Sequence, residues 1–80
     1  MRLDKFLKVS RLIKRRTVAK DVSDAGRVLI NQKVAKPSSE VKKGDIIEIG
    51  FGARKISVEV LDIRDSVPAA QAKDLYRVIE

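Results

Sequence analysis

The sequence contains no cysteine, no histidine and no tryptophan. Without cysteine no disulfide can support the fold, and without thiolate or imidazole groups a structural zinc site lacks its usual ligands. The chain also has no glycine-rich phosphate loop, and no nucleophile stands beside an evident base. These absences predict a protein that is not an enzyme and that uses neither a metal nor a cofactor.

Long apolar runs are absent as well. No segment reaches the roughly 7–15 apolar residues of a signal-peptide core or the ~20 of a membrane-spanning helix, so we expect a cytoplasmic protein. Aromatic residues are scarce, with two phenylalanines and one tyrosine. Phe6 is expected in the core and Tyr76 against a sheet. Without an aromatic platform, recognition of single-stranded RNA by base stacking is disfavoured.

Positive charge is what the chain has in excess, and it is concentrated in one part. Residues 1–36 carry 11 basic and 3 acidic side chains, a net charge of +8, whereas residues 37–80 carry 7 basic and 8 acidic ones, a net charge of −1. Such a localised field on a small domain favours a polyanionic partner, and nucleic acid is the first candidate. The densest segment contains Arg2, Lys5, Lys8, Arg11, Lys14, Arg15, Arg16 and Lys20.

Two short helices are predicted in this basic part. The helical spacing of Leu3, Phe6 and Leu7 predicts a first helix over residues 2–9, followed by a basic link over residues 10–16. Thr17 is expected to cap a second helix, and Gly26 to end it in a left-handed conformation. The expected apolar stripe of the second helix is Val18, Ala19, Val22 and Ala25.

The remainder of the chain predicts β-structure. Strands are expected at residues 28–30, 33–34, 46–49 and 56–60, with turns at 31–32 and 43–45 and a reversal at 51–52. The alternation of apolar residues shifts after Val60, which predicts a bulge at residues 60–62. A helical turn is expected at 68–74 and a last strand at 75–79. The whole predicts one α+β domain over residues 1–80, with two short helices on a small twisted, mostly antiparallel sheet.

The basic segment indicates how a polyanion would be bound. Arg15 and Arg16 directly precede the second helix, whose first amides carry partial positive charge and attract phosphate. Arg2, Lys5 and Lys8 extend the same field along the first helix. Phosphate and shape recognition of a folded RNA is therefore favoured.

Three other functions remain open at this point. An anionic membrane would attract the first helix, but the narrow apolar side of that helix is needed to cover the sheet. Duplex DNA would require the second helix in the major groove, although this helix carries Asp21 and Asp24 against Lys20. A detached RNA-modifying domain would need catalytic residues that the chain does not present.

Residues at specific spacings recur through the first part of the chain: Arg2 to Leu7, Arg11, Arg15, Arg16, Ala19, Gly26, Val28, Asn31, Ser39, Gly44 and Asp45. In these positions the chain resembles the αL RNA-binding motif named after small-subunit ribosomal protein S-four. The match covers residues 1–49, which leaves residues 50–80 as a β extension that completes the sheet. Within this family the chain resembles small stand-alone members, the ribosome-associated heat-shock proteins and above all the RqcP-like proteins.

The resemblance implies a factor of ribosome-associated quality control. RqcP-like proteins bind the large ribosomal subunit obstructed by a peptidyl-tRNA, contact ribosomal RNA and hold the tRNA in the P site. A protein called RqcH recruits alanyl-tRNA, so that alanine tails are added to the stalled chain. The implied partners are therefore large-subunit rRNA, P-site tRNA and an RqcH-like protein, bound by a monomer. The alternative is a heat-shock-type protein that binds structured RNA or the ribosome and rescues stalled peptidyl-tRNA without tailing.

Carried over by position, the resemblance makes Arg2 and Arg16 the first candidates for contact with ribosomal RNA. Asp4 has two open roles, since it can orient the first helix and pair with a neighbouring arginine, or touch a partner directly. Gly44 and Asp45 are interpreted as turn residues, like Gly26 and Asn31. The supporting candidates for RNA contact are Lys5, Lys8, Arg11, Lys14, Arg15 and Lys20.

Overall fold

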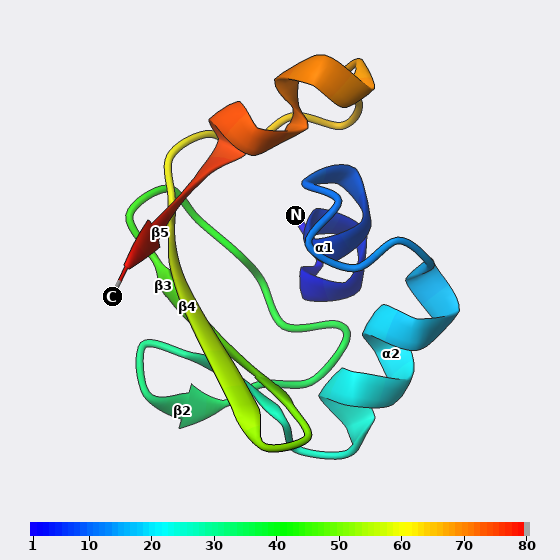
Figure 1. The fold of residues 1–80 in the computed structure, drawn as a ribbon, viewed down its shortest axis with the longest axis vertical. Coiled ribbons are helices and arrows are strands. Elements are labelled where there is room, and N and C mark those ends of the chain that lie inside the picture. Colours follow the sequence, from blue (N-terminus) through cyan, green and yellow to red (C-terminus); the bar gives the residue numbers. More distant parts are fainter. Residues whose placement is uncertain (80) are drawn as a thin grey trace.

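The computed structural model describes residues 1–79 and places helices α1 (Leu3–Val9) and α2 (Arg16–Asp24) beside a five-stranded sheet (Figure 1). The strands are β1 (Val28–Ile30), β2 (Lys33–Val34), β3 (Ile46–Phe51), β4 (Arg54–Val60) and β5 (Tyr76–Ile79). Their order is β2-β1-β3-β4-β5, and every described pair is antiparallel. A short 3-10 helix, η1 (Ala69–Leu75), leads into β5. The predicted α+β fold is confirmed.

The core lies between α1 and the inner face of the central strands. Residues two apart on a strand share a face, so alternate residues of β3 and β4 point toward the helices. Phe6 is the largest fully buried side chain, which confirms its predicted place in the core. The other residues of this core that are at most 1% exposed include Leu3, Leu7, Val28, Val41, Ile47, Ile49, Val58 and Val60.

The start of α2 differs from the prediction. The N-cap residue is Arg15, in an extended conformation and with no side-chain cap bond, and Thr17 lies inside the first turn. The expectation that Thr17 caps the helix is therefore wrong. The first turn instead follows the link directly, because the core holds the link in place and so determines where the helix begins.

The buried face of α2 also differs from the predicted stripe. Ala19 and Ser23 are buried, whereas Val18 is 42% exposed and Ala25 is exposed as well. The hydroxyl of Ser23 donates to the carbonyl of Ala19 at 2.8 Å, which satisfies a polar group that burial would otherwise penalise. Two of the four predicted positions are confirmed, because Ala19 is buried and the half-buried Val22 packs against the core.

The end of α2 confirms the prediction for Gly26. This residue has a φ of 74°, and its amide donates to the carbonyl of Ser23 at 3.0 Å. The amide of Arg27 donates to the carbonyl of Val22 at 3.2 Å. These two bonds form a Schellman motif, in which a glycine tolerates the left-handed conformation without strain.

Asn31 and Asp45 join two turns of the sheet, as predicted for turn residues. Asn31 and Gln32 have φ angles of 52° and 69°, the signs that a type I′ hairpin turn requires. The side-chain Nδ2 of Asn31 donates to Asp45 Oδ1 at 3.1 Å, and its Oδ1 accepts from the backbone amide of Ile46 at 3.0 Å. Asp45 Oδ2 accepts the Lys42 amide at 2.8 Å.

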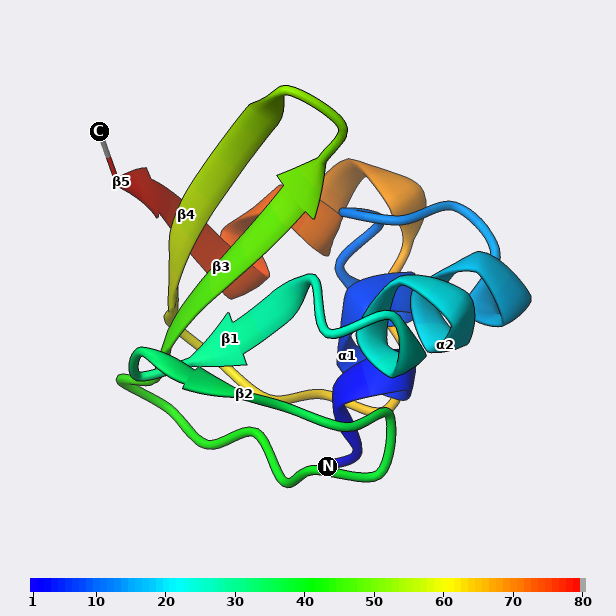
Figure 2. The same ribbon diagram turned by 90° about the horizontal axis from the view of Figure 1, so that it is seen from below.

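The last two strands extend the sheet with one correction, which concerns the reversal between β3 and β4. Phe51 still belongs to β3 and pairs with Arg54, so the reversal is made by residues 52 and 53 rather than 51 and 52. At the predicted bulge, regular pairing of β4 ends at Val60, and the two successive amides of Leu61 and Asp62 then donate to the one carbonyl of Leu75. Two residues thus lie opposite one, as the prediction of a bulge at residues 60–62 requires. Figure 2 shows the β3–β4 hairpin projecting beyond β1 and the helices. None of the helices within residues 1–79 has the length and apolar character to cross a membrane.

Candidate nucleic-acid interface

The first turn of α1 is anchored by the loop of residues 37–41. The amides of Leu3 and Asp4 donate to the carbonyls of Ser39 and Pro37 at 2.8 and 3.1 Å. The loop thus satisfies donors that the start of a helix leaves without intrahelical partners. These amides are not free to bind an anion, and the function of the anchor is to fix the side chains of Arg2 and Asp4.

A carboxylate joins the starts of the two helices. Both oxygen atoms of Asp4 accept from the forked guanidinium of Arg2, at 3.2 Å each, and Oδ1 also accepts from Arg16 Nη2 at 3.5 Å. The backbone amide of Lys5 adds a bond of 2.8 Å. Asp4 is 4% exposed, whereas Arg2 and Arg16 are 54% and 51% exposed. The buried acid therefore holds two half-exposed cations side by side.

Asp4 remains ionised within this cluster. Burial, the largest single influence, raises its pKa, but the hydrogen bond from Arg2, the charges of Arg16 and Arg2 and the bond from the Lys5 amide together outweigh it. The pKa of Asp4 therefore lies below its usual value. Two cations and one anion leave the cluster with a net positive charge, and guanidinium groups have further donors that can bind phosphate oxygens.

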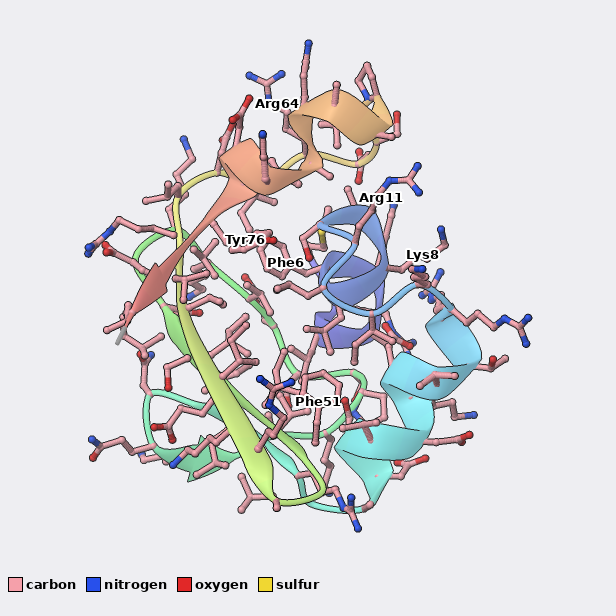
Figure 3. All side chains as sticks on the ribbon, in the orientation of Figure 1. Phe6, Lys8, Arg11, Phe51, Arg64 and Tyr76 are labelled. Atoms are coloured by element: carbon pink, nitrogen blue, oxygen red, sulfur yellow. The ribbon has the colours of Figure 1, made fainter. Side chains whose placement is uncertain are left out.

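The basic link between the helices is held by the core. Ser10 is buried, and its hydroxyl donates a hydrogen bond to the carbonyl of Leu7 at 3.3 Å. Ile13 is 5% exposed, and its backbone amide donates to the same carbonyl at 3.1 Å. Arg11, between these anchors, takes a φ of 60°, which residues other than glycine rarely adopt. Figure 3 shows Lys8 and Arg11 extending outward from this part of the molecule.

An ion pair connects this basic surface to the second half of the chain. Lys5 Nζ lies 3.1 Å from Asp65 Oδ1, in the segment before η1. Beside it, a hollow of about 160 Å³ is lined by α1, the link and that segment, through Lys8, Val9, Arg11, Ser66 and Val67. A separation of 60 residues between the ion-pair partners leaves no local signal of this contact in the sequence.

Ion pairing within the described residues differs between the two parts of the chain. In the second part, Asp62 pairs with Lys43 and Arg64 at 3.3 and 2.8 Å, and its pKa is lowered by the bonds from Arg64, the Ile63 amide and Lys43. Glu48 and Glu59 are likewise paired with cations of their own half. By contrast, five of the predicted RNA-contact residues have no ion-pair partner within residues 1–79: Lys8, Arg11, Lys14, Arg15 and Lys20.

The structure thus brings Arg2 and Arg16 together through Asp4, and it places the other predicted cations on α1, the link and α2. Lys14, Arg15 and Lys20 are exposed, whereas Lys5 and Lys8 are half-buried. No group of three or more acidic side chains in the described part of the chain is placed to hold a metal ion. The chemistry that this surface offers is the binding of phosphate groups.

Comparison with known proteins shows a family match and several similar proteins. Residues 1–47 match the S4 domain family. The chain is 50% identical over 80 residues to the RQC P-site tRNA stabilizing factor of Bacillus subtilis, covering all of this chain and 93% of that protein. It is 51% identical over 79 residues to the protein of the same name from Streptococcus pneumoniae, covering 99% and 90%. The trimeric structure of Vibrio cholerae Heat Shock Protein 15 is similar with a TM-score of 0.90 and 34% identity, over 99% of this chain and 81% of that one.

Proposed function

The chain belongs to the S4 domain family and, within it, to the RQC P-site tRNA stabilizing factors, a non-catalytic RNA-binding group, and from this membership we propose that it stabilises P-site tRNA on the large ribosomal subunit. The observation that carries the proposal is the pair of half-exposed arginines that Asp4 fixes at the starts of two helices. Fixed cations lose little freedom when they bind phosphate, so this pair is the preorganised part of the surface.

Each residue of the interface has a proposed role. Arg2 and Arg16 contact ribosomal RNA, and Asp4 acts as their positioning residue rather than as a contact. Lys5 becomes available when RNA competes with Asp65 for it. The residues proposed to contribute further phosphate contacts are Lys8, Arg11, Lys14, Arg15 and Lys20.

The remaining partners follow from the same proposal. The bound tRNA carries the stalled chain, and an RqcH-like protein brings alanyl-tRNA, so that the factor acts during alanine tailing in the cytoplasm. We propose that it acts as a monomer, because the localised positive charge opposes self-association in the absence of RNA. Sedimentation of the pure protein over a range of concentrations tests this point, and a trimer would contradict it.

A charge-reversal experiment tests the RNA contact. Tagged protein with Arg2→Glu and Arg16→Glu is expected to be lost from large subunits in a sucrose gradient. The control is Lys33→Glu with Lys73→Glu, which changes the net charge equally at two exposed positions outside the proposed surface. Equal loss of both variants would mean that only overall charge matters. Each phosphate contact removed should also lower the slope of log K against log salt by about 0.7–0.9.

The heat-shock alternative is kept because of the likeness to Heat Shock Protein 15. The two functions differ in their products. Purified large subunits should carry a P-site tRNA in both cases, but chains with added alanine accumulate only if the factor supports tailing. Deletion of the gene is expected to abolish these tails, and their persistence would favour rescue without tailing.

A further inference from the structure

The end of the β3–β4 hairpin carries an aromatic side chain on the surface. Phe51 is 41% exposed, although it shares the inner face of β3 with the fully buried Ile47 and Ile49. It lies beyond the core because the hairpin projects from the rest of the sheet (Figure 2). Phe51, which Figure 3 labels, is therefore a candidate for an aromatic contact in a chain that was expected to offer no aromatic platform.

The hairpin fixes the position of this ring. Phe51 pairs with Arg54 across the two-residue turn, and opposite residues of an antiparallel pair share a face of the sheet. Gly52 has a φ of 59°, as the first central residue of a type II′ turn requires. The amide of Gly50 donates to the carbonyl of Arg27 at 2.9 Å, which ties the strand to the end of α2 just before the ring.

A hollow of about 400 Å³ lies at this ring, lined by Phe51, Arg54, Lys55 and Ile56. This volume is within the ~300–1,000 Å³ range of ligand clefts. Its two charged residues are both positive, and no acidic side chain of residues 1–79 lines it. Lys55 is paired with Glu48 at 3.4 Å, whereas residues 1–79 provide no ion pair for Arg54. An aromatic ring beside a free guanidinium matches the two parts of a nucleotide, its base and its phosphate.

We propose that this hollow is a second RNA site, in which an unpaired nucleobase stacks on Phe51 while Arg54 binds the adjoining phosphate. This second site depends on the proposed function in one respect, namely that the protein binds RNA. It differs from the Arg2–Asp4–Arg16 surface in its chemistry, because that surface binds phosphates and this one also requires an exposed base. The factor would accordingly prefer structured RNA that has a flipped or single-stranded nucleotide next to the helix.

A nucleobase fits the hollow better than a protein segment does. The apolar part is limited to one ring and the half-buried Ile56, which is small for a protein interface. The cationic rim would repel a second copy of this basic chain, whereas it attracts RNA. Stacking on an aromatic side chain tolerates every base, so the site needs no sequence-specific partners.

The test uses an RNA hairpin in two forms, blunt and with a four-nucleotide 3′ overhang that contains 2-aminopurine. Wild-type protein is expected to bind the overhang form more tightly and to quench the 2-aminopurine fluorescence. Phe51→Leu keeps an apolar side chain but removes the aromatic plane, and should weaken binding of the overhang form by roughly 5- to 100-fold and abolish quenching. Phe51→Trp should retain both. Leu61→Ala is the matched control, because Leu61 is 45% exposed at the other end of β4.

The outcomes separate this proposal from the proposed function. Binding of the blunt hairpin should not change in Phe51→Leu, whereas it should fall in the variant with Arg2 and Arg16 reversed. Unchanged quenching and affinity in Phe51→Leu would overturn the stacking site and leave the function intact. An equal loss in Leu61→Ala, or a lower sedimenting mass for Phe51→Leu than for wild type, would also overturn it, the latter by showing that the ring joins copies of the chain.

Discussion

Replacement of Asp4 by asparagine separates the positioning role of this residue from simple electrostatics. The substitution keeps the size of the side chain and removes its charge, so the bonds from Arg2, Arg16 and the Lys5 amide lose their ionised acceptor. Hydrogen bonds to charged groups are worth ~1.5–3 kcal/mol each. The two arginines are half exposed and regain water when the carboxylate is lost, so we expect a total loss of about 1–3 kcal/mol in the free energy of unfolding.

This loss depends on pH in a defined direction. The pKa of Asp4 is lower in the folded protein than in the unfolded chain, where it is ~3.9. The stability that its charge contributes is therefore present in full above the unfolded value and is lost as the pH falls through the folded pKa. Thermal unfolding should show a lower Tm for Asp4→Asn at pH 7, by ~4–8 °C per kcal/mol. The difference from wild type should disappear in strong acid.

The effect on RNA binding is the sharper test. Asp4→Asn makes the protein more positive, so a purely electrostatic surface would bind RNA more tightly. We expect weaker binding, because two released arginines must be ordered again at ~0.5–1.5 kcal/mol each, or about 5- to 100-fold in total. Asp21→Asn is the control, since it changes the charge equally at an exposed position of α2. Affinity equal to or above that of this control would refute the positioning role.

The remaining predictions concern the fold and the edge of the surface. Phe6→Ala should cost ~3–5 kcal/mol, most of the stability of a domain of this size, and urea unfolding will show it as a midpoint near zero denaturant. Gly26→Ala should cost ~1 kcal/mol, because only the left-handed φ of 74° opposes it and its nearest contact, at 3.9 Å, is an ordinary one; thermal unfolding measures this. Asp65→Asn should change stability by less than ~1 kcal/mol but raise the affinity for RNA at low salt, since it frees Lys5.

Local chemistry made part of the fold predictable. The left-handed Gly26 and the turn at Asn31 were readable because a single residue type decides the backbone conformation there. The start of α2 was not readable, since Thr17 is a good cap by composition but the helix begins two residues earlier than such a cap would place it, with Arg15 as the N-cap. The stripe through Val18 failed for a related reason: tertiary packing selects which side of a short helix is buried.

The candidate site was predictable in composition and less so in geometry. The charge pattern predicted which part of the chain carries the cations, and the resemblance to the αL motif made Arg2 and Arg16 the first candidates among them. The sequence left open which of its two roles Asp4 plays, because its burial depends on a loop more than 30 residues away. Phe51 was read as part of a turn, since a hydrophobic residue before glycine gives no sign that its strand projects beyond the core.

The bonds between the loop of residues 37–41 and the first residues have a consequence for synthesis. Besides Leu3 and Asp4, Met1 joins this loop, because its carbonyl accepts the Val41 amide at 2.8 Å. Arg2 can therefore not take its final position until about half of the chain has been translated and residues 37–41 have formed their hydrogen bonds with residues 1–4. Such a long-range closure is slow compared with helix formation. A fragment that ends before this loop would contain all the basic residues of the densest segment, yet it would lack the contacts that arrange Arg2 and Asp4.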